Sequence, residues 1–164
     1  MKIVIVGVSA SGKSSFAREL SKKINVPTTH MDEIMWNPGW EYIGDEKTVA
    51  AINEAVKKED FIIEGYIDKA ARVNLFNTAD KILYLDYPGW LSAFRYIKRV
   101  LKHRKNPRPE LPGSPDKFSL KFLKLVYTKG EVGKLEKLLK ENDWNSKIIR
   151  FKKPREAQEY LQKI

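Results

Sequence analysis

The feature that most constrains this chain is the segment from Gly7 to Ser14, Gly-Val-Ser-Ala-Ser-Gly-Lys-Ser, which comes directly after the β-branched run Ile3–Val6. It matches the pattern G-x-x-x-x-G-K-[S/T], in which backbone N–H groups and the lysine surround phosphate groups. The motif needs a buried strand before it and a helix after it. Both are predicted, because Phe16, Leu20 and Ile24 recur on one side of a helix.

We expect this segment to bind the phosphates of ATP together with Mg²⁺. Lys13 should reach the β- and γ-phosphates, where its charge stabilises the transition state of phosphoryl transfer. Ser14 should ligate Mg²⁺ through its hydroxyl oxygen, a hard ligand of the kind this ion prefers. The residues expected to bind the nucleotide here are Gly7, Ser9, Ala10, Ser11, Gly12, Lys13, Ser14 and Ser15.

Strand and helix patterns alternate along the rest of the chain. Extended segments are predicted at residues 3–6, 28–30, 61–64, 81–86 and 148–151. Helical patterns fall at about 16–24, 49–56, 90–103, 118–125, 135–139 and 154–163. Parallel strands need long crossover connections, so the alternation predicts an α/β fold. The fold class is the three-layer P-loop NTPase fold, a parallel sheet with helices on both faces.

The helix predicted at 90–103 carries an apolar pattern, and we expect Leu91, Phe94, Ile97 and Leu101 to face inward.

Two segments are predicted to be irregular. The stretch from Met35 to Trp40 contains proline, glycine and two tryptophans and is typical of a loop. The Pro-rich stretch from Asn106 to Pro115 cannot be helical, and we expect it to form a lid over about residues 104–118. At 164 residues, with no linker or repeat, the chain is predicted to be one domain, residues 1–164.

Charge and composition limit the partners. Lysine and arginine number 31 against 21 acidic residues, a net charge of +10, which favours anionic partners such as nucleotides, nucleic acid or acidic metabolites. There is no cysteine, so disulfides and thiolate metal sites are excluded.

No apolar run reaches the roughly 18 residues of a membrane span, and no signal-peptide pattern opens the chain. We expect a cytoplasmic protein without a membrane partner, as monomer or dimer.

Magnesium also needs an acidic residue at the end of a neighbouring strand. Glu64 and Asp86 both follow apolar runs and are both candidates. Glu64 is preferred because it precedes a tight glycine turn at Gly65. The other interpretation is that either carboxylate only caps a helix or faces solvent.

Four segments together resemble the DNA topology modulation proteins, which are similar to adenylate kinase and other small kinases, and the resemblance covers nearly the whole chain. The most particular segment is His-Met-Asp-Glu-Ile-Met-Trp at 30–36, followed by Pro-Gly-Trp at 38–40. The others are Gly7–Ser15, Phe-Ile-Ile-Glu-Gly-Tyr at 61–66, and Leu-Asp-Tyr-Pro at 85–88 before a basic helix.

The resemblance implies the strand order 2-3-1-4-5, which places the third strand beside the first and so favours Glu64 over Asp86 for magnesium. The family usually has aspartate at this position. Arg95 and Arg99 match arginines that clamp the transferred phosphoryl group; the alternative is two solvated side chains.

Three further site assignments follow from the resemblance. Asp32 matches a carboxylate that orients or deprotonates the acceptor hydroxyl, or else it is a helix N-cap. Arg104 in the lid, with Lys105 and Arg108, would contact ATP, or else the lid is only a basic and mobile loop. Lys153, after the last strand, would lie beside the adenine. Where the family often has an arginine after the third strand, this chain has Lys69 and Arg72.

The aromatic loop and His30 stay open. Trp36 and Trp40 either stack on a substrate or form a packed satellite core. His30 either contacts substrate or is a satisfied structural residue.

The predicted function is an ATP- and Mg²⁺-dependent phosphotransferase with a small acceptor, either a nucleotide, a nucleoside or a hydroxylated metabolite. The alternative is an ATP-binding protein that associates with nucleic acid and affects DNA topology, or a kinase of polynucleotide 5′ ends. The alternative rests on the net charge and on cations clustered between residues 98 and 108.

Overall fold

The computed structural model describes residues 1–65 and 69–164, with side chains described from Arg72 onward in the second range. Tyr66, part of the third-strand motif, and the side chain of Lys69 lie outside the described residues. In the described part, no helix combines the length and the apolar character needed to cross a membrane.

Five strands form the central sheet, and every neighbouring pair is parallel. The strand order is β2-β5-β1-β6-β7, which is 2-3-1-4-5 when these five are counted along the chain, so the predicted order is confirmed. β5 therefore lies directly beside β1, with Glu64 next to Ile5. The strands are β1 (Lys2–Gly7), β2 (Thr28–His30), β5 (Phe61–Glu64), β6 (Lys81–Leu85) and β7 (Ile148–Phe151).

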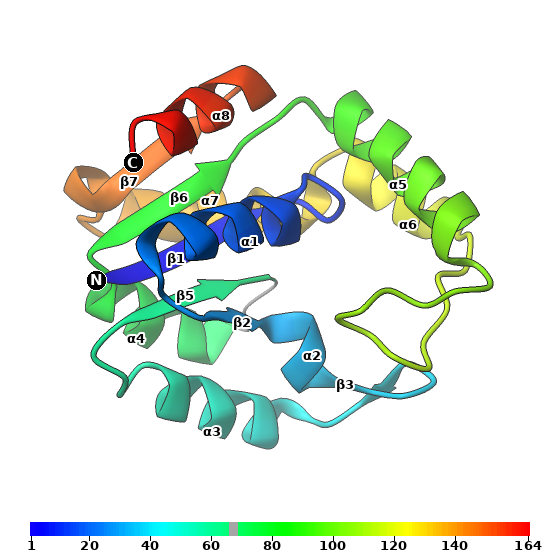
Figure 1. The fold of residues 1–164 in the computed structure, drawn as a ribbon, viewed down its shortest axis with the longest axis horizontal. Helices are drawn as coiled ribbons and strands as arrows, with labels where there is room; N and C mark the ends of the chain where they lie inside the picture. Colours follow the sequence, from blue (N-terminus) through cyan, green and yellow to red (C-terminus); the bar gives the residue numbers. More distant parts are fainter. Residues whose placement is uncertain (66–68) are drawn as a thin grey trace.

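Helices cover both faces of this sheet, as Figure 1 shows. Successive side chains of β1 point to opposite faces. Ile3 and Ile5 pack with residues of α1 and α8, whereas Val4 and Val6 pack with residues of α3, α4 and α7. The helices are α1 (Lys13–Ile24), α2 (Met31–Met35), α3 (Asp45–Ala55), α4 (Lys69–Thr78), α5 (Gly89–His103), α6 (Leu120–Tyr127), α7 (Gly133–Glu141) and α8 (Pro154–Gln162), with short 3₁₀ turns η1 (Gly130–Val132) and η2 (Asn145–Lys147). The predicted α/β fold is confirmed, and α4 is a helix that the sequence patterns did not indicate.

The segment predicted as an irregular loop contains a small antiparallel hairpin. Its strands are β3 (Trp36–Asn37) and β4 (Glu41–Tyr42). Gly39 and Trp40 at its tip both have positive φ, 86° and 66°. The ring of Trp36 packs against the rings of Trp40 and Tyr42, so aromatic packing stabilises a hairpin too short to be predicted from strand periodicity.

The orientation predicted for α5 is wrong for three of its four apolar residues. Leu91 packs against the core, but Phe94, Ile97 and Leu101 are exposed, and the buried positions are instead Ser92, Ala93, Tyr96 and Val100. The helix contacts α6 at Gly89, which lies against the Tyr127 backbone, and at Tyr96, whose ring packs on Phe122. Its arginines line the cavity, and this rotation leaves Phe94, Ile97 and Leu101 outside.

Candidate functional site

The loop between β1 and α1 has the backbone geometry of a phosphate cradle. Gly7 and Gly12 have φ values of 153° and 102°, and Ala10 also has a positive φ, 61°. A Cβ on Gly7 would lie 2.7 Å from the backbone oxygen of Leu85 on the neighbouring strand. Glycine is therefore required at position 7 by both conformation and space, which explains why the motif begins there.

Lys13 lies at the start of α1 with its side chain folded back over the cradle. Its Nζ donates to the backbone oxygens of Gly7 and Val8, both at 3.0 Å. Nearby, the buried hydroxyl of Ser11 has no hydrogen-bond partner within the described residues. The cradle thus holds an ammonium group and a free hydroxyl beside a helix N-terminus, the arrangement in which phosphate oxygens are bound.

A cavity of about 680 Å³ opens in front of this loop, a volume typical of small-molecule sites. It brings together most of the residues predicted from the sequence: Ser9, Ala10, Ser11, Gly12, Lys13, Ser14, Ser15, Asp32, Glu64, Arg95 and Arg99. Three predicted nucleotide contacts do not line it. Gly7 lines a small neighbouring hollow, Arg104 follows the end of α5 beside a different hollow, and Lys153 is the exposed residue that precedes α8.

Glu64 is buried at the end of β5 and pairs with His30 at the end of β2, with 2.6 Å between His30 Nδ1 and Glu64 Oε1. The hydrogen bond with Glu64 raises the pKa of His30 against the opposing effect of burial. Burial alone would raise the pKa of Glu64, but the His30 hydrogen bond, the Lys13 charge and the Ser14 hydroxyl together hold it below its usual value. Glu64 is therefore an ionised carboxylate next to Lys13 and Ser14.

The competing magnesium candidate, Asp86, is engaged elsewhere. Its carboxylate forms ion pairs with Lys129 and with Arg150, the latter at 3.0 Å, and it does not line the cavity. Asp86 is therefore paired with two cations outside the cavity, whereas Glu64 lines the cavity together with the β1–α1 loop.

Three arginines approach the cavity from α5 and from the loop at 104–119. Arg95 donates to the backbone oxygen of Ser11 in the cradle. Arg99 and Arg108 share Asp116, at 3.5 and 3.3 Å from their Nε atoms. Within the described residues neither Nε makes a well-directed hydrogen bond, and burial together with the Arg108 charge lowers the pKa of Arg99. The two guanidinium groups are held by Asp116 and, through Arg108, also by Asp32.

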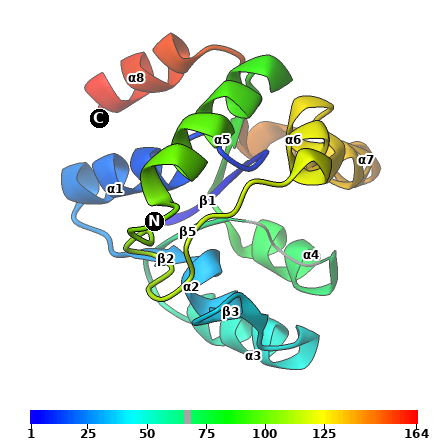
Figure 2. The same ribbon diagram turned by 90° about the vertical axis from the view of Figure 1, so that its right-hand side faces the viewer.

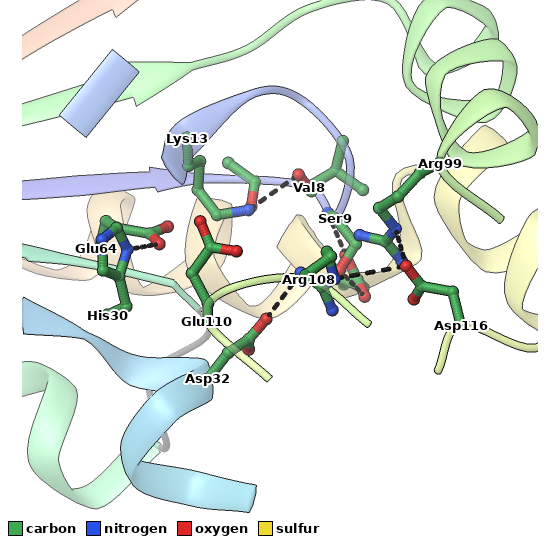
Figure 3. A network of polar contacts seen from close by, with 12 residues as sticks. Val8, Ser9, Lys13, His30, Asp32, Glu64, Arg99, Arg108, Glu110 and Asp116 are labelled. Atoms are coloured by element: carbon green, nitrogen blue, oxygen red, sulfur yellow. Dashed lines mark hydrogen bonds and ion pairs between the residues drawn. The ribbon is translucent and has the colours of Figure 1, made fainter. Parts of the chain in front are cut away.

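Asp32 faces these arginines from α2, and Figure 3 shows it on the opposite side of the cavity from α5. Its carboxylate lies 3.4 Å from Arg108 Nη1 and is about one-third exposed. Asp32 belongs to the first turn of α2 and is not the residue that caps it. The N-cap interpretation is therefore wrong.

The loop at 104–119 is fixed on two sides of the cavity. Glu110 pairs with Arg18 on α1, and Arg108 reaches Asp32 on α2. At the hairpin, Ser114 Oγ accepts from the backbone N–H of Gly39 at 3.0 Å.

Trp40 is part of this attachment, because its Nε1 donates to the backbone oxygen of Pro115 at 2.9 Å. Neither Trp36 nor Trp40 lines the cavity. Of the two interpretations of these tryptophans, the packed satellite core fits the structure.

Some residues of the site were not found from the sequence. Glu131, in η1, accepts from the backbone N–H of Ser9 at 2.6 Å and from its hydroxyl at 2.8 Å. Asp116 and Glu110 hold the arginines described above. No local pattern indicates these carboxylates, since each partner is distant in sequence and their proximity arises only from folding.

The donor set fits ATP and Mg²⁺. Ser14 and Glu64 offer hard oxygen ligands beside the cradle, as this cation requires. Within the described residues no cluster of three or more acidic or histidine side chains could hold a metal by itself. A magnesium ion here would therefore rely on phosphate and water oxygens as well, which is its usual mode of binding in kinase sites.

Comparison with known proteins gives the class of fold. No protein-family model matches the chain, and no curated protein matches it. The solved structure of a shikimate kinase from Bacteroides thetaiotaomicron is similar, with 16% sequence identity and a TM-score of 0.60, over 99% of this chain and 95% of that one. A gluconokinase from Sinorhizobium meliloti 1021 matches with 18% identity and a TM-score of 0.58, over 99% and 91%. The chain has the fold of the P-loop kinases.

Proposed function

We propose that this protein is an ATP- and Mg²⁺-dependent phosphotransferase that acts on a small hydroxylated acceptor. The observation that carries the proposal is one cavity in which Lys13, Glu64, Asp32 and Arg99 converge from four separate elements. A cation at the phosphates, a carboxylate for the metal, a carboxylate for the acceptor and an arginine pair between them are the parts that phosphoryl transfer needs.

The β1–α1 loop would bind the triphosphate of ATP. Lys13 would move from the backbone oxygens of Gly7 and Val8 to the β- and γ-phosphates, exchanging two neutral acceptors for charged ones. Ser14 and Glu64 would hold Mg²⁺, Glu64 through the oxygen that His30 does not engage. The metal, when bound, neutralises charge on the phosphate oxygens.

Asp32 would orient the acceptor hydroxyl and take its proton. The new bond joins the acceptor oxygen to the γ-phosphorus, the bond to the β-phosphate oxygen breaks, and ADP leaves. Arg99 and Arg108 would stabilise the charge on the transferred group between Asp32 and Lys13. The loop at 104–119, which contains the lid predicted at about residues 104–118, would exclude water that would otherwise hydrolyse ATP.

The resemblance to DNA topology modulation proteins keeps nucleic acid as the second candidate. The basic cluster that motivated it is divided in this structure. Arg99, Lys102, His103 and Arg108 line the cavity, while Lys98 and Arg104 do not. Cations that face into a cavity of about 680 Å³ favour a small anionic substrate over a duplex, and the small-acceptor kinase is the better supported function.

The test is ADP formation by the purified protein with Mg²⁺ and ATP, with nucleoside monophosphates, nucleosides, small hydroxylated metabolites and 5′-hydroxyl oligonucleotides as acceptors. One acceptor class should accelerate ADP formation, and Lys13→Ala should abolish it. Lys22→Ala, an exposed lysine later in the same helix, is the matched control and should keep full activity.

Asp32→Asn separates the acceptor step from ATP binding. It should lower kcat by about 100-fold or more, in line with the loss of a general base, while ATP affinity stays near that of the wild type. If no acceptor raises ADP formation and duplex DNA binds with a steep salt dependence, the kinase proposal is wrong.

A further inference from the structure

The outer face of α5 carries a continuous apolar stripe, formed by Trp90, Phe94, Ile97 and Leu101. Their spacing of four, three and four residues puts them on one side of the helix over about 16 Å. Trp90 and Leu101 are each 62% exposed and Phe94 is 52% exposed. Figures 1 and 2 agree that α5 lies at the periphery of the molecule, away from the sheet. Large apolar side chains gathered in this way mark an interaction surface.

The stripe continues into a hollow beside the C-terminal half of α5. Ile97 and Leu101 line this hollow together with Phe118, which is 58% exposed. Val100 adds to its apolar lining, and Arg104, Lys117 and the buried Asp116 are its charged members. Arg104 and Lys117 are the two of these three that are exposed.

The segment that carries this surface also carries most of the net charge of the protein, although Arg95, Arg99 and Arg108 face the main cavity and Lys129 pairs with Asp86. Residues 87–130 contain eleven lysine and arginine residues against two acidic ones, which amounts to +9 of the +10 of the whole chain. Both acidic residues, Glu110 and Asp116, are buried in ion pairs. The exposed cations are Lys98, Lys102, Arg104, Lys105, Lys117, Lys121 and Lys124. In the part of the chain that the structure describes, none of these seven forms an ion pair.

The way the cations meet the stripe indicates the partner. Lys98 Nζ lies over the Phe94 ring, 4.6 Å from its centre, so a lysine charge stands directly at the stripe. A helix with tryptophan, phenylalanine and leucine on one side and lysines along the border is the pattern of helices that lie in the interface of an anionic membrane.

We propose that the outer face of α5, with the adjoining hollow, docks on an anionic lipid surface. The stripe would enter the boundary between headgroups and acyl chains while the surrounding lysines contact lipid phosphates. A second copy of the chain is disfavoured, because it would bring two strongly positive surfaces together. Nucleic acid could stack on Trp90 and Phe94 but would leave the aliphatic side chains of Ile97 and Leu101 without an apolar partner, which disfavours it. The lack of a membrane-spanning segment, on which the expectation of no membrane partner rested, does not exclude binding at a lipid surface.

The first experiment is sedimentation of the full chain with vesicles of phosphatidylcholine that contain about one-third phosphatidylglycerol. We expect the protein to bind these vesicles and not vesicles of phosphatidylcholine alone. Binding should fall steeply with salt, because the Debye length, over which the lysine charges act, falls from about 10 Å at 0.1 M salt to about 3 Å at 1 M.

Two double variants test the two parts of the surface. Phe94→Gln with Leu101→Gln should abolish binding, and both sites are exposed enough for the fold to tolerate the change. Lys98→Gln with Lys121→Gln should weaken binding by about fivefold for each lysine. Lys22→Gln with Lys23→Gln, two exposed lysines on α1, is the matched control and should bind like the wild type.

A spectroscopic readout locates the contact. The emission of Trp90 should shift to shorter wavelength on binding, and the shift should be absent in Trp90→Phe. The proposal is overturned if anionic vesicles do not bind, if the Gln variants of the stripe bind unchanged, or if the control lysines matter as much as Lys98 and Lys121. It is equally overturned if those stripe variants abolish binding to single-stranded DNA or dissociate a dimer of the protein while leaving vesicle binding intact.

Discussion

Glu64 and His30 form one unit at the residue scale, although they stand 34 positions apart. Each stabilises the charged form of the other, because a buried carboxylate without a partner would favour protonation. The interpretation of His30 as a structural residue fits its contact, and through that contact it also determines the charge and orientation of the proposed magnesium carboxylate. A histidine that holds a metal-binding group in place is a common arrangement around such sites.

The pair makes stability depend on pH. The pKa of His30 is raised above 6.5, so its contribution is complete below 6.5 and is lost as the pH rises through the raised value. The pKa of Glu64 is lowered from 4.5, so its contribution is complete above 4.5 and is lost as the pH falls through the lowered value.

His30→Asn should therefore lower the free energy of unfolding most between pH 4.5 and pH 6.5, by about 2 kcal/mol. The loss should be smaller toward about pH 9. Urea unfolding at several pH values measures this. His103→Asn is the control, because this second histidine contacts the backbone oxygen of Asn106 and forms no ion pair in the described residues. A cost for His30→Asn that does not vary with pH would contradict the ion pair.

Glu131 is a positioning residue for the β1–α1 loop, since it accepts two hydrogen bonds from Ser9 and lines no part of the main cavity. Glu131→Gln keeps the shape of the side chain and removes the charge that strengthens both bonds. We expect the Kd for ATP to rise about tenfold, the equivalent of about 1.4 kcal/mol.

Direct titration with a non-hydrolysable ATP analogue measures this without any assumption about the acceptor. Glu136→Gln is the control, because that carboxylate pairs with Arg150 and does not contact the loop. Unchanged affinity in Glu131→Gln would show that Ser9 is held by the backbone alone.

At the scale of elements, the contact between α5 and α6 determines where the arginines of the site point. The two helices meet most closely where Gly89 faces Tyr127, and a Cβ on Gly89 would lie 1.8 Å from the Tyr127 backbone oxygen. This approach fixes the rotation of α5, which directs Arg95 and Arg99 into the cavity and the apolar stripe outward. The proposed catalytic face and the proposed docking face therefore depend on a single packing contact.

Gly89→Ala should destabilise the protein by about 1–3 kcal/mol, because the backbones of both helices must separate. Gly133→Ala, at the start of α7, is the matched control. A Cβ there meets nothing within 4 Å, and the change should stabilise by about 0.4–1 kcal/mol through the unfolded state. The midpoints of urea unfolding distinguish the two, and equal midpoints would contradict the assigned contact.

At the scale of the whole molecule, the site is assembled from parts that are distant along the chain. The β1–α1 loop, the end of β5, the start of α2, α5 and the loop at 104–119 all contribute to the main cavity. The last of these connects α1, α2 and the β3–β4 hairpin through separate contacts. A ligand that contacts all of these parts should therefore stabilise the entire fold.

ATP with Mg²⁺ should raise the Tm of the wild type. At a concentration 100-fold above Kd, binding adds about 2.7 kcal/mol to the free energy of unfolding. Lys13→Ala should lose most of the shift, whereas Lys22→Ala should retain it. Calorimetry measures the effect independently of turnover, so a wild-type Tm that is insensitive to ATP would argue against nucleotide binding itself.

The sequence by itself determined the features that depend on neighbours along the chain. The glycines, Lys13 and Ser14 of the first loop lie in one continuous segment between a strand and a helix, and so the phosphate cradle could be predicted from spacing. Apolar runs and helical periodicity gave the parallel sheet, because burial on both faces requires continuous apolar strands. Glu64 was a candidate because it ends an apolar run before a glycine turn, whereas Asp32 was named through a resemblance in short motifs.

Only the tertiary structure decided which distant groups meet. Glu131 reaches Ser9 across 122 positions, and His30 engages Glu64, through contacts that no local pattern encodes. The periodicity of α5 showed which residues share a face but not which face meets the core. The packing of α5 on α6, with its arginines directed into the cavity, determined which face meets the core. Phe94 and Leu101 therefore stay at the surface.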